Sequence, residues 1–142
     1  MVPYIHKVQY YETDMMGITH HANYIYWMEE ARIDYMEQLG YPYSRMEKEG
    51  IKSPVRSVSC VYKHPSTFGD VITIHVSVGD FNGVMLTILY DMRNQKDETV
   101  CEAQSEHVFV SGEGRLVRLN KVQPEFCRAI ESVMRPSETA ED

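Results

Sequence analysis

The stretch that decides the fold runs from residue 23 to residue 40 and reads NYIYWMEEARIDYMEQLG. Its apolar residues recur every three or four positions, which is the period of an α-helix. They form one stripe, made of Tyr24, Trp27, Met28, Ala31, Tyr35 and Leu39. Asn23 is a typical helix cap, and Gly40 followed by Pro42 ends the pattern. We therefore predict a helix over residues 24–39 that packs one face against a large apolar surface.

Beyond residue 50 the apolar residues alternate, which is typical of β-strands. In VITIHVSV, residues 71–78, the isoleucines and the last two valines share one face. Asn82-Gly83 then predicts a tight hairpin turn. Further strands are predicted over residues 84–92, 99–110, 54–62 and 4–11, and a short helix over residues 44–48. One strand, a long helix and then four antiparallel strands indicate an α+β fold in which a sheet wraps one helix.

The composition is that of a single globular domain. The chain has 142 residues, of which 43% are hydrophobic and 25% are charged. Its net charge of −7 argues against nucleic-acid binding, because a nucleic-acid footprint is basic. No apolar run suits a membrane helix and the first residues lack a signal peptide, so we expect a cytoplasmic protein. We predict one domain over residues 1–134 and a flexible tail over residues 135–142.

The cysteines agree with a reducing compartment. Cys60, Cys101 and Cys127 are odd in number and widely spaced, and no C-x-x-C motif is present. Such a pattern is typical neither of a disulfide framework nor of a zinc site. We expect all three to be packing residues. Neither His20 nor His21 pairs with a Cys or a carboxylate at metal-ligand spacing, so no metal site is predicted.

The segment before the long helix, residues 10–24, reads YYETDMMGITHHANY. Glu12 and Asp14 lie where the first strand gives way to a loop, and Gly17 allows that loop a tight path. The helix start that follows offers unpaired backbone N–H groups. A carboxylate facing such donors suits acyl transfer, because the donors stabilise the oxyanion that attack creates. From spacing alone, the alternative is that Asp14 only caps a loop and Glu12 is solvated.

The same segment resembles the 4-hydroxybenzoyl-CoA thioesterase family of hotdog-fold acyl-CoA thioesterases. The resemblance is carried by ETDxMGIxxHANY at residues 12–24, ExAR at 29–32 and LG at 39–40, and it covers residues 4–111. It implies a hotdog fold, a long central helix wrapped by a curved antiparallel sheet of about five strands. It also implies that Asp14 is catalytic and that the backbone N–H of His21 is the oxyanion donor. Many members have Asp where this chain has Glu12, so the resemblance assigns Glu12 no role.

Other candidate residues each have a structural alternative. Gly17 and Tyr24 are predicted substrate contacts within the pattern, although Tyr24 also belongs to the apolar stripe. Lys63 and Pro65 are predicted contacts in VYKHP, residues 61–65. The His21 imidazole is a candidate acid or substrate contact in addition to its backbone. The candidate cations for CoA phosphates are Lys63, Arg115 and Arg118, with a solvated role as the alternative for each.

The resemblance implies a thioesterase that converts acyl-CoA or acyl-carrier-protein thioesters to a free acid and a thiol without a cofactor. Asp14 is then a nucleophile or a general base on water. Two alternatives stay open: a non-catalytic acyl-CoA-binding hotdog protein, and a hotdog dehydratase or hydratase. We expect a homodimer or homotetramer, because sheet edges need covering and hotdog subunits join their sheets. Residues 54–65 of the partner are expected to face Asp14.

Overall fold

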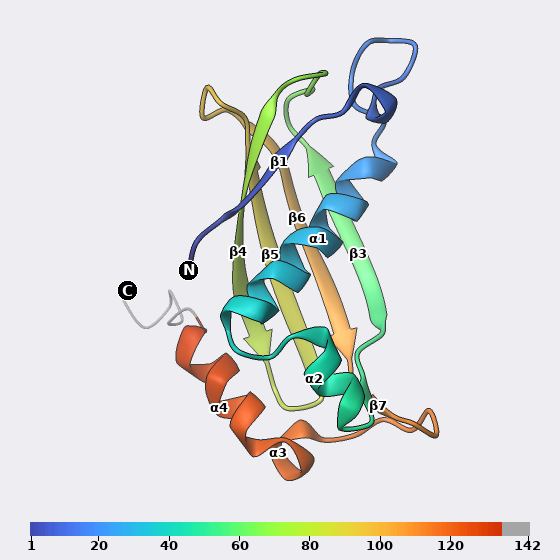
Figure 1. Cartoon of the computed structure of the whole chain (residues 1–142), viewed down its shortest axis with the longest axis vertical. Helices are drawn as coiled ribbons and strands as arrows, with labels where there is room; N and C mark the ends of the chain where they lie inside the picture. The colour runs from blue at the N-terminus through green and yellow to red at the C-terminus, as the bar shows by residue number, and fades with distance from the viewer. Residues whose placement is uncertain (135–142) are drawn as a thin grey trace.

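Helix α1, Ala22–Gln38, lies across one face of a curved antiparallel sheet (Figure 1). The computed structural model describes residues 1–134, and the predicted flexible tail, residues 135–142, lies outside the described residues. The sheet has five strands in the order β1-β4-β5-β6-β3. They are β1 Tyr4–Lys7, β3 Val55–Tyr62, β4 Val71–Phe81, β5 Met85–Arg93 and β6 Thr99–Val108. The predicted α+β architecture is confirmed.

Smaller elements complete the described chain. They are the one-turn helix η1 Tyr10–Glu12, α2 Tyr43–Lys48, β2 Ile51–Lys52, β7 Val110–Ser111, α3 Leu119–Val122 and α4 Pro124–Val133. Strands β2 and β7 pair in a separate two-stranded sheet. Helices α3 and α4 lie at the end of the molecule opposite the start of α1 (Figure 1).

The predicted apolar stripe of α1 is the face that packs on the sheet. Its buried members are Tyr24, Trp27, Met28, Ala31 and Tyr35. The helix begins at Ala22, so the predicted cap Asn23 lies in the first turn and that prediction is wrong. The Asn23 side-chain amide instead donates to the main-chain carbonyls of Glu12 (2.9 Å) and His20 (3.2 Å). The predicted stop is confirmed, because Gly40 follows the helix with a φ of +91°.

The predicted hairpin joins β4 to β5. Asn82 Oδ1 accepts the N–H groups of Val84 (2.9 Å) and Met85 (2.8 Å), and Gly83 has the positive φ, +88°, that favours glycine. The predicted alternation is confirmed by the buried residues Ile72, Ile74, Val78, Leu86, Ile88, Tyr90 and Met92. Burial of an apolar side chain contributes about 1.5–3 kcal/mol, so the layer between these strands and α1 is a major source of stability.

Two predicted strands are shorter than expected. The strand predicted over residues 4–11 ends at Lys7, because Gln9 is the N-cap of η1 and its backbone N–H donates to the Glu12 side chain (2.9 Å). The strand predicted over residues 99–110 ends at Val108, and the next residues form β7, which pairs with β2. In both places a local turn or a distant partner takes the backbone hydrogen bonds that a longer strand would use.

Helix α4 is a feature that the strand and helix predictions do not include. It begins with Pro124 and buries Phe126, Cys127 and Ile130. Proline at a first helical position and apolar residues at helical spacing are the sequence signals for this element. Because those three residues enter the main core, α4 is part of the folded unit.

The cysteines are free thiols in or beside the core, as predicted. Cys101 and Cys127 are buried and Cys60 is half-buried. Burial, as the largest cause, raises the pKa of Cys101 to about 12, so its thiol is neutral at physiological pH. Within residues 1–134, no helix has the length and apolar character to cross a membrane.

Candidate active site

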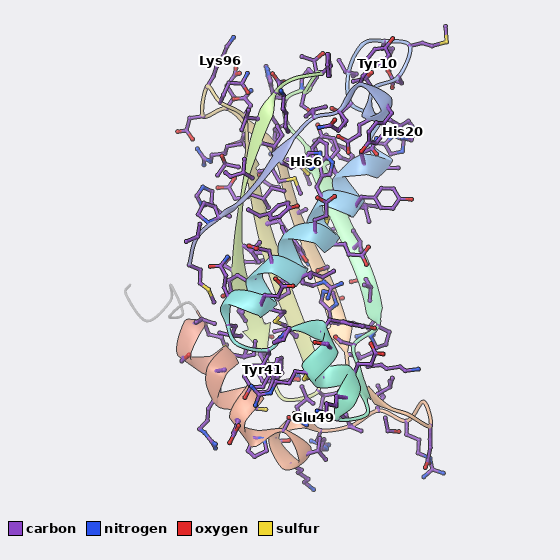
Figure 2. The ribbon with its side chains drawn as sticks, in the orientation of Figure 1. His6, Tyr10, His20, Tyr41, Glu49 and Lys96 are labelled. Carbon is purple, nitrogen blue, oxygen red and sulfur yellow. The ribbon has the colours of Figure 1, made fainter. Side chains whose placement is uncertain are left out.

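A cleft of about 370 Å³ separates the segment that leads into α1 from the segment that follows β3. Its walls include Asp14, His21 and Tyr24 on one side and Tyr62, Lys63 and Pro65 on the other. Figure 2 shows this end of the molecule beside the labelled Tyr10 and His20. Both walls belong to one chain. The expectation that residues 54–65 of a partner subunit also face Asp14 stays a prediction. A hollow of about 850 Å³ along the sheet is lined by none of the predicted site residues.

Asp14 begins a tight loop and is half-buried. Its Oδ1 accepts the N–H of Met16 (2.9 Å), its backbone N–H donates to the Ile18 carbonyl (2.9 Å), and Gly17 closes the turn with a φ of +79°. Gly17 therefore shapes the loop and lies outside the cleft lining. No group of residues 1–134 donates a hydrogen bond to Asp14 Oδ2. That oxygen is free to bind water or to approach a carbonyl carbon.

His21 occupies the N-cap position of α1, but its side chain does not cap the helix. The N–H groups of Ala22, Asn23 and Tyr24 bind His20 Nδ1 (3.3 Å), the His20 carbonyl (3.0 Å) and the His21 carbonyl (3.2 Å). The backbone N–H of His21 donates to no group in the described part of the chain. It is an available donor at the positive end of the helix dipole. The imidazole is exposed and lies 4.5 Å from the His20 ring, centroid to centroid.

Glu12 is buried, with 4% of its surface exposed, so the alternative that it is solvated is wrong. Its Oε1 lies 2.9 Å from the Gln9 N–H nitrogen and 2.8 Å from His6 Nε2, and its Oε2 accepts the Trp27 indole N–H at 2.7 Å. Burial by itself raises the pKa of Glu12, but the three hydrogen bonds outweigh burial and leave the pKa lowered. Glu12 is therefore an ionised anchor that does not line the cleft.

Two tyrosines form an aromatic wall of the cleft. The Tyr24 and Tyr62 rings lie 5.1 Å apart, and the Tyr62 hydroxyl donates to the His21 carbonyl at 3.4 Å. Tyr24 is buried, and its hydroxyl lies 2.8 Å from Ser66 Oγ, so its core and cleft roles coexist. Burial, as the largest cause, raises the pKa of Tyr62 to about 12, which keeps the phenol neutral. Tyr62 is not among the predicted substrate contacts of this chain, although the partner segment expected to face Asp14 includes it. Tyr62 alternates with the half-buried Cys60, which is the signal that places it on the helix-facing side.

The predicted phosphate-binding cations do not gather at the cleft. Lys63 lines it but is paired with Glu102 at 3.4 Å. Tyr62 pairs with Cys101 near the start of β6, and the ten residues of that strand carry the chain about 30 Å away. Arg115 and Arg118 follow, at the other end of the molecule (Figure 1). Within one chain, Lys63 is therefore the candidate cation at the cleft, whereas Arg115 and Arg118 fit the solvated alternative.

The sequence and the fold agree with those of known thioesterases. The model of the thioesterase-like superfamily matches residues 8–130. YneP of Bacillus subtilis (strain 168), a putative acyl-CoA thioesterase, is 36% identical over 130 residues, which cover 91% of this chain and 94% of YneP. A putative esterase of Aquifex aeolicus (strain VF5) is 34% identical over 122 residues, which cover 84% of this chain and 94% of the relative.

Solved structures give the same result. A DHNA-CoA thioesterase from Staphylococcus aureus has a TM-score of 0.88 at 29% sequence identity, and the match covers 92% of this chain and 89% of that one. A protein of Thermus thermophilus, TT1821, has a TM-score of 0.86 at 28% identity, with 94% and 99% of the two chains covered. With its long helix wrapped by a five-stranded sheet, the chain belongs to the thioesterase-like superfamily and has the hotdog fold.

Proposed function

We propose that this chain hydrolyses acyl-CoA thioesters to a free carboxylic acid and a thiol, with Asp14 and the backbone N–H of His21 as the reacting groups. One observation carries the proposal: Asp14, which has a free carboxylate oxygen, lines the same cleft as His21, whose backbone N–H has no partner among residues 1–134. Superfamily membership and relatives named as acyl-CoA thioesterases support the same reaction.

The geometry supports two routes for Asp14. As a general base, it removes a proton from water while the water oxygen bonds to the thioester carbon. As a nucleophile, it bonds to that carbon itself and forms a mixed anhydride, which water then hydrolyses. In both routes the carbonyl oxygen gains negative charge, which the N–H of His21 stabilises. The C–S bond then breaks and the leaving thiolate takes up a proton.

The substrate class follows from the shape and walls of the cleft. It is open to the surface, and the Tyr24 and Tyr62 rings form an apolar wall against which an acyl group can pack. CoA and acyl carrier proteins present the thioester on the same kind of flexible arm. We therefore include both as thiol carriers, and expect a panel of short, long and aromatic acyl thioesters to identify the preferred acyl group.

The active unit in this proposal is a homodimer. Strand β3 is an edge of the five-stranded sheet, and every residue of it except Cys60 is exposed. An edge of this length leaves backbone groups unpaired, and a second β3 can satisfy them. Pairing of two β3 strands would extend the sheet across both subunits, and two such dimers would form the tetramer. The free cysteines support a reducing compartment, which we take to be the cytoplasm.

The test of the proposed function is thiol release by the Asp14→Asn variant. Asn keeps the size of the side chain and an oxygen for the Met16 N–H, but it is a far weaker base and nucleophile. We expect kcat to fall by about 10²–10⁴, the usual range for loss of a general base. Circular dichroism should show an unchanged fold. Asp97→Asn is the matched control, because that carboxylate is exposed in the β5–β6 turn.

Two results would contradict the proposal. Wild-type protein that binds acyl-CoA without releasing thiol would be a binding protein, and an Asp14→Asn variant within a few-fold of wild type would exclude Asp14. Turnover in ¹⁸O-water tests the route. Label found in the Asp14 carboxylate after repeated turnover indicates an anhydride that water opens at the Asp14 carboxyl carbon. Label confined to the product acid indicates that water attacks the acyl carbon, either of the thioester itself or of the anhydride, and excludes only opening at Asp14.

A further inference from the structure

Glu12 is the one buried carboxylate among residues 1–134, and the proposed reaction does not use it. Its side chain joins three segments of the fold. The Gln9 N–H comes from η1, His6 comes from β1, and the Trp27 indole N–H comes from the second turn of α1. All three contacts are between 2.7 and 2.9 Å. A buried charge held this tightly costs free energy to desolvate, so its placement calls for a specific role.

The main chain of Glu12 makes a second set of contacts. Its carbonyl accepts the backbone N–H of His20 at 2.8 Å and the Asn23 side-chain amide at 2.9 Å. Asp14 lies two residues after Glu12, and His21 directly follows His20. One residue therefore holds both the start of the Asp14 loop and the start of the helix that carries the His21 N–H.

We infer that Glu12 is a positioning residue, which sets the distance between the Asp14 carboxylate and the backbone N–H of His21. The inference rests on the proposed function. Asp14 acts at the carbonyl carbon, and the His21 N–H binds the oxygen of the same carbonyl. An error of about 1 Å in their separation can therefore cost about 10²-fold in rate. Glu12 does not line the cleft, so it acts through these two residues.

Substitution by Gln tests this role because every partner of the Glu12 side chain is a donor. An ionised carboxylate only accepts, so His6 Nε2 carries a proton in this contact. Gln has one accepting oxygen and one NH₂ group. In one orientation the NH₂ faces the Trp27 N–H, and in the other it faces the Gln9 N–H. Either way two donors meet at a distance that held a hydrogen bond, and the segment must shift.

We expect Glu12→Gln to lower kcat by about 10- to 100-fold. KM should stay within about threefold, because Glu12 does not contact the opposite wall of Tyr62, Lys63 and Pro65, which still binds the substrate. Trp27→Phe removes one of the two conflicting donors. It should itself lower kcat by only about three- to tenfold, and the double variant should be no slower than Trp27→Phe within about threefold. The matched control is Glu30→Gln, which alters the other carboxylate near His6 (3.5 Å) without touching the loop.

A second readout does not depend on turnover. Amide hydrogen exchange in residues 13–21 should rise in Glu12→Gln and not in Glu30→Gln, with each variant held below its melting temperature. If the wild type shows no thioesterase activity, the proposed function fails while the exchange result still tests the anchor. If the wild type is active, an unchanged kcat, a loss matched by Glu30→Gln, or unchanged exchange overturns the positioning role. If Glu12→Gln does not fold, an unchanged kcat in Trp27→Phe overturns it.

Discussion

At the residue scale, the proposed chemistry is divided between a side chain and a backbone group. Asp14 presents a free carboxylate oxygen, whereas His21 offers its N–H from the N-cap position of α1. The imidazole of His21 is exposed and makes no hydrogen bond within the described residues. The two contributions of His21 can therefore be separated by substitution.

We expect His21→Ala to retain activity within a few-fold, because alanine supplies the same backbone N–H. His21→Pro removes that N–H and should lower kcat by about 10²–10³. Proline is compatible with the φ of −58° at this position, although it restricts His20 before it. Thiol release with circular dichroism as the folding control measures both. An Ala variant as slow as Asp14→Asn would assign the role to the imidazole instead.

His107 provides a pH prediction at the same scale. It lies in a buried chain in which the Tyr90 hydroxyl, Ser105 Oγ and His107 Nε2 are 2.7 Å apart at each step. His107 Nδ1 has no partner in the described residues. Burial, followed by the charge of Arg32, lowers the pKa of His107 to about 4. The folded protein therefore holds this imidazole neutral at physiological pH.

Below the ordinary histidine pKa of about 6.5, the unfolded chain takes up a proton at His107 that the folded chain rejects. The free energy of unfolding therefore falls as the pH drops from about 6.5 toward 4, by about 2 kcal/mol at pH 5. When the pH falls from about 7.5 to 5, the free energy of unfolding of His107→Gln should drop by about 2 kcal/mol less than that of the wild type. Urea unfolding at the two pH values measures this. A difference between the two proteins that does not vary with pH would contradict it.

At the scale of elements, α4 closes the end of the core farthest from the cleft. Phe126 lies within 5.2 Å of the Tyr41 ring and 5.8 Å of the Phe109 ring, both edge-on. Phe126→Ala should therefore lower the free energy of unfolding by about 3–5 kcal/mol through lost burial and a cavity. Arg128→Ala, on the exposed side of the same helix, should change it by less than about 0.5 kcal/mol. Equal losses in the two variants, measured by urea unfolding, would show that α4 does not pack as described.

At the scale of the whole molecule, the open edge at β3 predicts a dimer. Light scattering should report about twice, or four times, the chain mass of 16.5 kDa. Ser59 lies near the middle of β3 and is exposed. Ser59→Glu should weaken the assembly, because two like charges would meet close to the symmetry axis. Glu113→Gln, in an exposed loop outside the sheet, is the control. A wild-type protein that stays monomeric would leave the Asp14 chemistry intact but exclude pairing at β3.

The sequence by itself determined which faces of the elements are buried and where the central helix and hairpin lie. The apolar residues of each element recur with the period of that element, because one of its faces packs into the core. Examples are Trp27 and Ala31 in α1, and Ile74 and Ile88 in the sheet. Asp14 and His21 are singled out instead by the resemblance to the 4-hydroxybenzoyl-CoA thioesterase family, whose pattern is contiguous along the chain.

Only the tertiary structure decided which distant residues meet. The contact of Glu12 with Trp27 and His6, the place of Tyr62 opposite Tyr24, and the separation of Arg115 from the cleft depend on strand order and register. Periodicity states which face of a segment is apolar but not which segment covers it. That choice follows from packing over the whole core. Strand β3 comes before β4, β5 and β6 in the chain, yet these three strands lie between β1 and β3 in the sheet, where β3 pairs with β6 at the edge.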